Sequence, residues 1–497
     1  MTIVLWVGAT LAILAGIAVL ILACVLLLLN AMYDSIQPLP PTSVPEEEET
    51  SSALFRHLPF LKSRLAYTPL GVFPTPIHRA HIPNLTGPGQ HGAIFIKRED
   101  LSSPIYGGNK VRTLQHQLAA CVEHLKTHPD ATFISVGSGG SNQNVAAVVH
   151  GRRLGVAVHP FLLKPDVPDI DNTLNVLSLL SFNPPVLRFW TTPLANLTSL
   201  VRALVFGPTK VFTMGGNNML GVLGQIGGLL ELAEQIHAGE MPDVDVLYLP
   251  IGSACTITGL ILGVVLARHL NLHAFRSLRI VGVPVHPIIA HMEKRLGLFT
   301  SSWGLLSPLS PRYGIRRAAV YLQQQGLDID LEPLAVAFLH HNVDICLDTD
   351  LIGQYGTHSV TSLAAASFDS VLQVDGPAPK WATDTVHKTP WLCGHFAAKP
   401  FAKMLQDIEA ETHSTKAKTP LVRLFWQTKS WIQPRGPADE WQRLVDVAAT
   451  APSVREWANQ GRASSLLRRG SVRLPHGSPE TYQSLMTAVD LETVSHQ

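Results

Sequence analysis

The longest apolar run of the chain covers residues 3–29. It contains no charged residue, and Thr10 is its one distinctly polar side chain. A helix rises about 1.5 Å per residue, so a helix of this length exceeds a bilayer core of roughly 30 Å. A cleavable signal would have a basic segment and a shorter apolar stretch. We therefore predict a single transmembrane helix, with residues 1–31 as a membrane anchor; a cleaved signal and a buried core helix are the alternatives.

The residues after the apolar run are polar and rich in proline. Residues 37–52 combine several prolines with four consecutive glutamates, a composition typical of a solvated linker. We predict a Pro/Glu-rich linker over residues 32–66. The first basic residue is Arg56, which lies too far from the apolar run to indicate the orientation of the anchor. The side of the membrane on which the following chain lies is therefore left open.

The body of the chain alternates strand patterns, glycine-containing turns and helix patterns. The first series is a strand at 131–136, a Gly-Ser-Gly-Gly turn at 137–140, a helix at 144–154 and a strand at 156–163. The second series is a strand at 244–250, a turn at 252–256, a helix at 257–269 and a strand at 278–285. This repetition predicts an α/β fold with parallel sheets covered by helices. We place the body at residues 67–430 and a partly helical or disordered tail at residues 431–497.

The composition indicates that the body has a hydrophobic core, and it argues against a nucleic-acid partner and a metal site. The chain has 497 residues, of which 46% are hydrophobic and 15% charged, so it is not mostly disordered. The 38 basic and 37 acidic residues leave a net charge of +1, which argues against a nucleic-acid partner. The five cysteines form no CxxC pair, and His286 and His291 are five residues apart. Neither pattern has the spacing of a metal site, so we expect no metal.

The strongest chemical candidate is a lysine at a turn. Lys110 follows Gly107, Gly108 and Asn109 and precedes a helix predicted over residues 111–126. The positive end of the helix dipole and partial burial would both lower the pKa of its amine. A neutral lysine amine is what covalent catalysis on a carbonyl carbon requires. The alternative is an ordinary surface lysine at a loop-to-helix junction.

Two further turns join a strand to a helix and carry small polar residues. Residues 252–256, Gly-Ser-Ala-Cys-Thr, allow backbone N–H groups to converge at a helix N-terminus, which favours a phosphate. The hydroxyls of Ser253 and Thr256 would add donors. Residues 139–144, Gly-Gly-Ser-Asn-Gln-Asn, offer amide and hydroxyl donors, or alternatively a capped helix start.

Taken in order, these segments resemble a known family. KREDL and GGNKVR, followed by GSNQ, GGNN at residues 215–218 and GSACT, are similar to the pyridoxal-phosphate-dependent D-cysteine desulfhydrase and 1-aminocyclopropane-1-carboxylate deaminase family. The resemblance covers residues 68–426. It implies pyridoxal 5′-phosphate as cofactor and a two-domain, tryptophan synthase β-like fold (fold type II). A smaller domain would be inserted at about residues 111–218, within a catalytic body at 67–430.

The resemblance also implies roles for individual residues. Lys110 would bond to the cofactor aldehyde and move the substrate α-proton. The substrate carboxylate would be received by Ser141, Asn142 and Gln143, with Asn142 also beside the cofactor ring. The phosphate would be held by Gly252, Ser253, Ala254, Cys255 and Thr256. Tyr355 would face the substrate, so that Lys110, Tyr355 and Ser141 are the catalytic candidates.

Several positions depart from the family pattern, among them Met214, where a proline is common, and Cys255, where glycine is more frequent. Phe396 stands where the family has a tyrosine, and Ala397 stands where a glutamate or threonine often lies near the pyridine nitrogen. The missing hydroxyl at Phe396 disfavours cyclopropane ring opening. Without a polar group at Ala397, another hydroxyl, such as that of Thr428, or a water would have to serve the pyridine nitrogen.

The resemblance implies a lyase acting on a small amino acid, and together with the apolar run it leads us to expect a membrane-anchored lyase. The expected reaction is D-cysteine desulfhydrase-like α,β-elimination to pyruvate, ammonia and sulfide. The alternatives are deaminase-like ring opening and a catalytically weakened, membrane-tethered protein that binds the cofactor. A homodimer is compatible with the sequence, whereas the exact substrate, its chirality and the organelle are left open.

Overall fold

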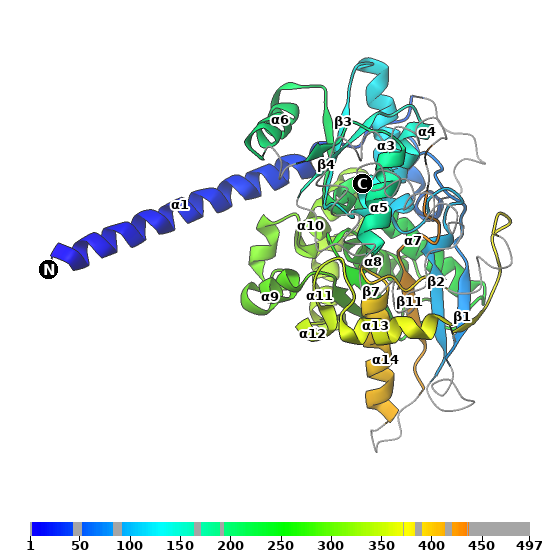
Figure 1. Cartoon of the computed structure of the whole chain (residues 1–497). Helices are drawn as coiled ribbons and strands as arrows, with labels where there is room; N and C mark the ends of the chain where they lie inside the picture. Colours follow the sequence, from blue (N-terminus) through cyan, green and yellow to red (C-terminus); the bar gives the residue numbers. More distant parts are fainter. Residues whose placement is uncertain are drawn as a thin grey trace, which may run out of the picture.

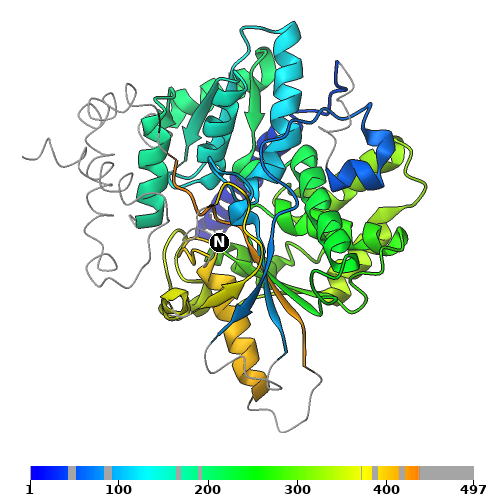
Figure 2. The same cartoon turned by 90° about the vertical axis from the view of Figure 1, so that its right-hand side faces the viewer.

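The computed structural model describes residues 2–42, 52–82, 92–163, 170–188, 193–370, 372–382, 390–412, 420–434 and 436. The predicted α/β fold with mostly parallel sheets is confirmed: the described strands form two sheets, flanked by helices. The two sheets and their helices stack one above the other in Figure 2. The predicted tail from residue 437 onward lies outside the described residues.

The larger sheet has seven strands in the order β10-β1-β2-β11-β7-β8-β9. Their bounds are Gln373–Asp375 (β10), Ile77–His81 (β1), Ile94–Arg98 (β2), Arg423–Gln427 (β11), Val246–Ile251 (β7), Arg279–Pro284 (β8) and Val343–Ile345 (β9). The pairs from β2 to β9 are parallel, whereas β1 runs antiparallel to β2 and β10. All residues of β2, β11 and β7 are buried, as expected for parallel strands covered on both faces.

The smaller sheet has four parallel strands in the order β5-β4-β3-β6. These are Phe133–Gly137 (β3), Val158–Leu162 (β4), Leu187–Arg188 (β5) and Lys210–Phe212 (β6). Its connecting helices are Asn142–Arg153 (α4), Ile170–Ser181 (α5) and Pro193–Phe206 (α6). Strand β3 overlaps the strand predicted at 131–136 and ends one residue past it, and β4 falls within the strand predicted at 156–163. The division of the chain into domains stays a proposal, since two sheets do not by themselves define a boundary.

Helices α3 (Lys110–Thr127), α7 (Met219–His237) and α8 (Cys255–His269) pack together against the larger sheet. Glycine lets α7 and α8 approach closely, because a Cβ on Gly259 would lie 2.3 Å from the Cβ of Gln225. The remaining helices are Ala53–His57 (α2), Pro287–Leu296 (α9), Pro311–Gln324 (α10), Leu331–Asn342 (α11), Thr349–Ile352 (α12), Val360–Ala366 (α13) and Ala398–Thr412 (α14), with 3₁₀ turns at Pro59–Leu61 (η2), Glu99–Leu101 (η3), Met214–Gly216 (η4), Ser302–Leu306 (η5) and Ser367–Ser370 (η6).

The N-terminal helix α1 (Thr2–Tyr33) leaves the body as a long single rod (Figure 1). Its segment Ile13–Tyr33 is long and apolar enough to cross a membrane, with a mean hydropathy of 2.9. The most apolar part of this segment is not buried against the body. Only its last turns pack on the body within the described chain, where Met32 is buried beside Leu200 of α6.

The predicted linker over residues 32–66 is not solvated throughout its described part. Leu54, Phe55 and Leu61 lie fully buried in the main core, where α2 packs on α7. This stretch packs on the body because its own side chains are apolar, although the segment before it is polar. The body also continues past residue 430, since Trp431 and Gln433 are buried.

Candidate active site

Lys110 is the first residue of α3, and the turn before it is pinned to the end of β11. Gly108 adopts a φ of +90°, and a Cβ there would lie 2.5 Å from the backbone oxygen of Thr428. The N–H of Asn109 donates to the same oxygen at 3.1 Å. Lys110 Nζ donates to the carbonyl of Gly215 at 2.9 Å. Burial lowers the pKa of Lys110 and outweighs the opposing effect of Cys255, which favours the neutral amine.

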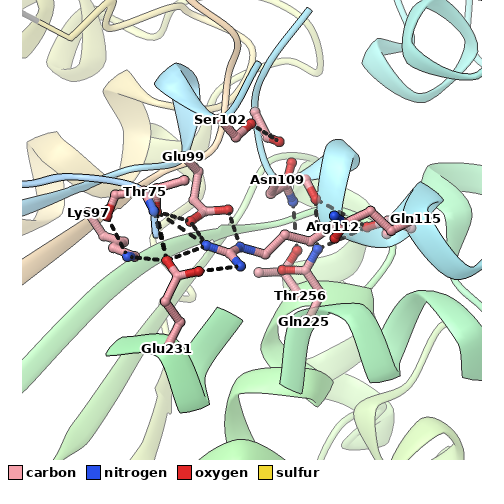
Figure 3. A network of polar contacts seen from close by, with 12 residues as sticks. Thr75, Lys97, Glu99, Ser102, Asn109, Arg112, Gln115, Gln225, Glu231 and Thr256 are labelled. Carbon is pink, nitrogen blue, oxygen red and sulfur yellow. Dashed lines mark hydrogen bonds and ion pairs between the residues drawn. The ribbon is translucent and has the colours of Figure 1, made fainter. Parts of the chain in front are cut away.

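A buried ionic network fixes the helix that begins at Lys110 (Figure 3). Arg112 donates from Nε to Glu99 at 2.7 Å and from Nη2 to Glu231 at 2.7 Å. Lys97 Nζ reaches the same Glu231 oxygen at 2.7 Å, and the Thr75 N–H donates to it at 2.9 Å. Two cations thus face two anions in the core, which explains the Lys-Arg-Glu and Asn-Lys-Val-Arg segments as parts of one structure.

The same region joins the Lys110 turn to the turn at residues 252–256. Asn109 Nδ2 donates to Thr256 Oγ1 at 2.7 Å, and Gln225 Nε2 donates to the Asn109 carbonyl at 2.8 Å (Figure 3). These bonds run from α3 to the start of α8 and to α7. The lysine and the small-residue turn are therefore held at a fixed separation.

A cavity of about 390 Å³ lies between the two sheets, and all the candidate residues predicted from the sequence line it. These are Lys110, Ser141, Asn142, Gln143, Gly252, Ser253, Ala254, Cys255, Thr256 and Tyr355. Phe396 and Thr428 also line it, whereas Ala397 is fully buried and is not among the lining residues. The remaining wall is largely apolar and includes Val285, Ile288, Ile289 and Leu309. The fold thus brings together segments separated by more than two hundred residues of sequence.

The turn at residues 141–143 begins helix α4. Ser141 Oγ accepts from the N–H of Asn144 at 3.4 Å, so the capped helix start considered from the sequence is present, and Ser141 also lines the cavity. Both polar atoms of the Gln143 side chain are buried and have no hydrogen-bond partner among the described residues. A polar ligand in the cavity would supply one.

Asn142 is oriented by residues that the sequence did not single out. Its Oδ1 accepts from Asn175 Nδ2 at 2.7 Å, from Lys429 Nζ at 2.7 Å and from the Tyr106 hydroxyl at 3.1 Å. With the oxygen so engaged, the amide N–H₂ group is the part of Asn142 available to the cavity. The one sequence feature that could have indicated a role for Lys429 is its position next to Thr428. No sequence feature indicated a role for Asn175.

The turn at residues 252–256 lies between β7 and α8. Ala254 has a φ of +65°, which turns the chain sharply before a helix of 15 residues. Asn217 Nδ2 holds the turn by donating to the Ser253 carbonyl at 2.5 Å. Burial raises the pKa of the Cys255 thiol to about 11 against the opposing effect of Lys110, so this thiol is neutral. The hydroxyl-bearing residues Ser253 and Thr256 line the cavity at the N-terminus of α8 and form a site suited to an anion.

Tyr355 and Phe396 both line the cavity and contact the ring of His395. The Tyr355 hydroxyl lies 3.4 Å from Ser138 Oγ, and its ring centre lies 4.4 Å from that of His395. Phe396 stacks on His395 at 3.9 Å. Burial, reinforced by Lys399 and Lys429, lowers the pKa of His395 well below its ordinary value, so its imidazole is neutral.

The residues of the cavity fit pyridoxal phosphate. Thr428 Oγ1 is buried at the cavity and lacks a hydrogen-bond partner in the part of the chain that the structure describes, as a donor reserved for a ring nitrogen would. Gly215 leaves no room for a side chain, because a Cβ there would lie 2.3 Å from Ser253 Oγ. The amine of Lys110, the anion site at residues 252–256 and the hydroxyl of Thr428 thus all lie at the same cavity.

Comparisons with known proteins agree with this geometry. Residues 68–296 match the model of a family described as pyridoxal-phosphate dependent enzymes. A bifunctional D-cysteine desulfhydrase/1-aminocyclopropane-1-carboxylate deaminase, mitochondrial, of Arabidopsis thaliana is 31% identical, over 41% of this chain and 53% of that protein. A D-cysteine desulfhydrase of Salmonella paratyphi A is 29% identical, over 45% of this chain and 65% of that protein.

The matched part therefore spans between about half and two thirds of these relatives. A solved structure of an ACC deaminase homologue has the same fold, with a TM-score of 0.50 and 18% identity, covering 80% of this chain and 99% of that one. The lysine-bearing turn, the anion site and these matches all indicate the same cofactor, pyridoxal phosphate. Over residues 68–296, this chain is therefore similar to the family of pyridoxal-phosphate dependent enzymes.

Proposed function

We propose that the chain is a pyridoxal-phosphate-dependent lyase that converts D-cysteine and water to pyruvate, ammonia and hydrogen sulfide. The observation that carries this proposal is the position of Lys110, whose amine lies in the cavity formed by the 141–143 and 252–256 turns. The similarity to a desulfhydrase and to a bifunctional desulfhydrase/deaminase supports this choice of reaction.

The cavity residues have distinct parts in holding the cofactor. The phosphate would be bound by the N–H groups of residues 252–256 and by the hydroxyls of Ser253 and Thr256. Asn142 would donate to the 3′ oxygen attached to the cofactor ring. Thr428 Oγ1 would meet the pyridine nitrogen. When bound, the cofactor supplies an electron sink for the charge that develops at the substrate α-carbon.

The chain itself would bind the substrate and move its proton. Ser141 and Gln143 would receive the carboxylate, and the neutral amine of Lys110 would take the α-proton as general base. Loss of the α-proton would allow the bond between the β-carbon and sulfur to break, and the sulfur, which keeps the electron pair of that bond, would leave as hydrogen sulfide once protonated. With one water, the rest of the substrate would end as pyruvate and ammonia. The apolar wall at Ile288, Ile289 and Phe396 would limit access of water to the reacting carbon.

Lys110→Ala tests the assignment of the covalent lysine. We expect the purified variant to lose the visible absorbance band of the bound cofactor and to release no sulfide or pyruvate from D-cysteine. Lys126→Ala, at the exposed end of the same helix α3, is the matched control and should keep both. A full band in the Lys110 variant, or borohydride labelling of another lysine, would refute the assignment.

A second candidate is a cofactor-binding protein with little turnover. Phe396 and Ala397 motivate it, since neither offers the polar group that the family pattern has at its position. A visible band together with silence toward D- and L-cysteine and D- and L-serine would favour this candidate. Sulfide release at a rate proportional to bound cofactor would exclude it.

The finer proposal for α1 is that it anchors the chain as a single membrane span. Its length and apolar composition support this placement. The full chain should remain in the membrane pellet after an alkaline carbonate wash, and detergent should release it. Recovery of the full-length chain in the carbonate supernatant would contradict a span.

A further inference from the structure

The surface from which α1 leaves the body carries a cluster of exposed apolar side chains. In Figure 1, α6 lies on one side of the base of α1 and α9 on the other. The cluster, here called the apolar collar, consists of Leu194, Val201, Val205 and Phe206 of α6, Trp303 and Leu306 of η5, and Ile288 and Leu296 of α9. Single exposed apolar residues are ordinary, but a group of this size on adjoining elements marks an interaction surface.

The α6 part of the collar is a regular stripe. Leu194, Val201 and Val205 are 75%, 41% and 62% exposed. Their spacing of seven and four residues places them on one face of the helix, since successive residues turn by about 100°. The opposite face is buried, where Leu200 packs beside Met32 of α1. The helix therefore has apolar residues on both faces, and only one face has a partner within the described chain.

The other elements of the collar also adjoin α1. Asn30 Nδ2 approaches the Leu306 carbonyl of η5 at 3.5 Å, and Asn30 Oδ1 accepts from the Tyr313 hydroxyl at 2.6 Å. Ser301 Oγ donates to the Leu296 carbonyl at 2.8 Å, which links η5 to the end of α9. The collar thus continues the apolar surface of the N-terminal helix onto the body.

We infer that the apolar collar is a membrane-contact surface, which seats the body on the bilayer that α1 crosses. This inference rests on the proposed anchor. Trp303 is 69% exposed, and tryptophan favours the boundary between acyl chains and headgroups. The exposed charges beside the collar on α6 and α9 are the basic side chains of Arg202, Lys294 and Arg295, which complement anionic headgroups.

The position of the collar bears on how the cavity meets the membrane. Ile288 is 54% exposed and also lines the cavity of about 390 Å³. The candidate site therefore adjoins the surface that faces the bilayer. Substrates would enter beside the headgroups rather than from the far side of the body.

Lipid quenching of a dye on the full chain tests the collar. Cys24 in α1 is exposed, whereas the other four cysteines are buried, so one dye label can be moved by substitution. In a Cys24→Ser background, Phe206→Cys and Trp303→Cys place the label on the collar. Gln373→Cys, on the exposed edge strand β10, is the matched control; β10 pairs with β1, which lies on the side away from α1 in Figure 1. Cys24 of the unaltered chain reports on the anchor.

Each labelled chain is reconstituted into phosphatidylcholine and phosphatidylserine vesicles that contain nitroxide-labelled acyl chains. We expect the labels at Cys24 and at both collar positions to be quenched, and the control label at position 373 to keep its emission. Quenching at Cys24 with collar labels that behave like the control would overturn the collar but leave the anchor. Unquenched labels at all positions would refute both proposals. A collar label that is blue-shifted but not quenched indicates another protein surface there and also overturns the inference.

Discussion

At the scale of single residues, the site depends on which atom of Asn142 faces the cavity. Its oxygen is held by Asn175, Lys429 and Tyr106, so its N–H₂ group is directed to the cavity. Lys429 is 1% exposed and also lies 5.2 Å from the ring centre of Trp391. It reaches the cavity through Asn142 and is therefore a positioning residue rather than a catalytic one.

Replacing Lys429 tests this role. Lys429→Met keeps the length of the side chain but removes the donors to Asn142. We expect kcat for sulfide release to fall by roughly 10- to 100-fold, because a hydrogen bond to a charged group contributes about 1.5–3 kcal/mol. The absorbance maximum of the bound cofactor should shift as well, which a purely structural role would not cause. Lys403→Met, in a partly exposed ion pair of α14, is the control and should change neither.

Phe396 should decide between elimination and ring opening. Its ring lines the cavity and stacks on His395, where a tyrosine hydroxyl would add a donor and acceptor. We expect the natural chain to release no 2-oxobutyrate from 1-aminocyclopropane-1-carboxylate and Phe396→Tyr to gain a measurable rate. Release by the natural chain at a rate comparable to that of sulfide would contradict this assignment.

At the scale of elements, the placement of α3 rests on its buried ion pairs. Arg112 and Lys97 outweigh the effect of burial and lower the pKa of Glu231 to about 2. The same burial lowers the pKa of Lys97, against the opposing effect of Glu231. Removing one partner from such a network leaves a buried charge without its counter-ion.

Glu231→Gln should destabilise the chain by about 3–5 kcal/mol, the usual loss when one member of a buried ion pair is removed. Urea unfolding followed by circular dichroism would measure it. Glu409→Gln, at an exposed position of α14, should leave the unfolding midpoint unchanged. An equal midpoint in both variants would show that the network does not hold α3.

The pH dependence of stability follows from the same carboxylate. The pKa of Glu231 is lower in the folded chain, at about 2, than its ordinary value of 4.5. Its contribution to stability is therefore present above about pH 4.5 and is lost as the pH falls toward 2. Acid titration of the unfolding free energy should include this loss in the natural chain and lack it in Glu231→Gln.

At the scale of the whole molecule, the cofactor should join the two sheets. The 141–143 turn belongs to the smaller sheet, and the 252–256 turn and Thr428 to the larger one. Asn217 and Gln433 already bridge the two parts, since Gln433 Nε2 donates to Ser178 Oγ of α5 at 2.7 Å. A ligand held from both sides stabilises the folded chain by mass action.

Cofactor removal should therefore lower the melting temperature of the detergent-solubilised chain. At a cofactor concentration of 100 times Kd, we expect the free energy of unfolding to be about 2.7 kcal/mol higher with cofactor than without it. Lys110→Ala, which keeps the phosphate site but cannot form the covalent bond, should gain less from added cofactor. Calorimetry with and without cofactor would measure both, and equal melting temperatures for the natural chain would argue against a ligand between the sheets.

The sequence by itself determined the local features: the apolar helix, the alternation of strands and helices, and the turns that carry Lys110, Ser141 and residues 252–256. These follow from periodicity and from the short-range chemistry of glycine, asparagine and lysine. The family pattern then linked the turns to one cofactor.

Only the tertiary structure decided how those turns meet and what surrounds them. Within the segment predicted as a linker, Leu54, Phe55 and Leu61 are buried where α2 packs on α7, a contact that no local pattern reveals. Asn175 of α5 and Lys429 after β11 became parts of the site because both contact Asn142, far from either in the sequence. Such contacts depend on the path of the whole chain, whereas a turn depends on its own few residues.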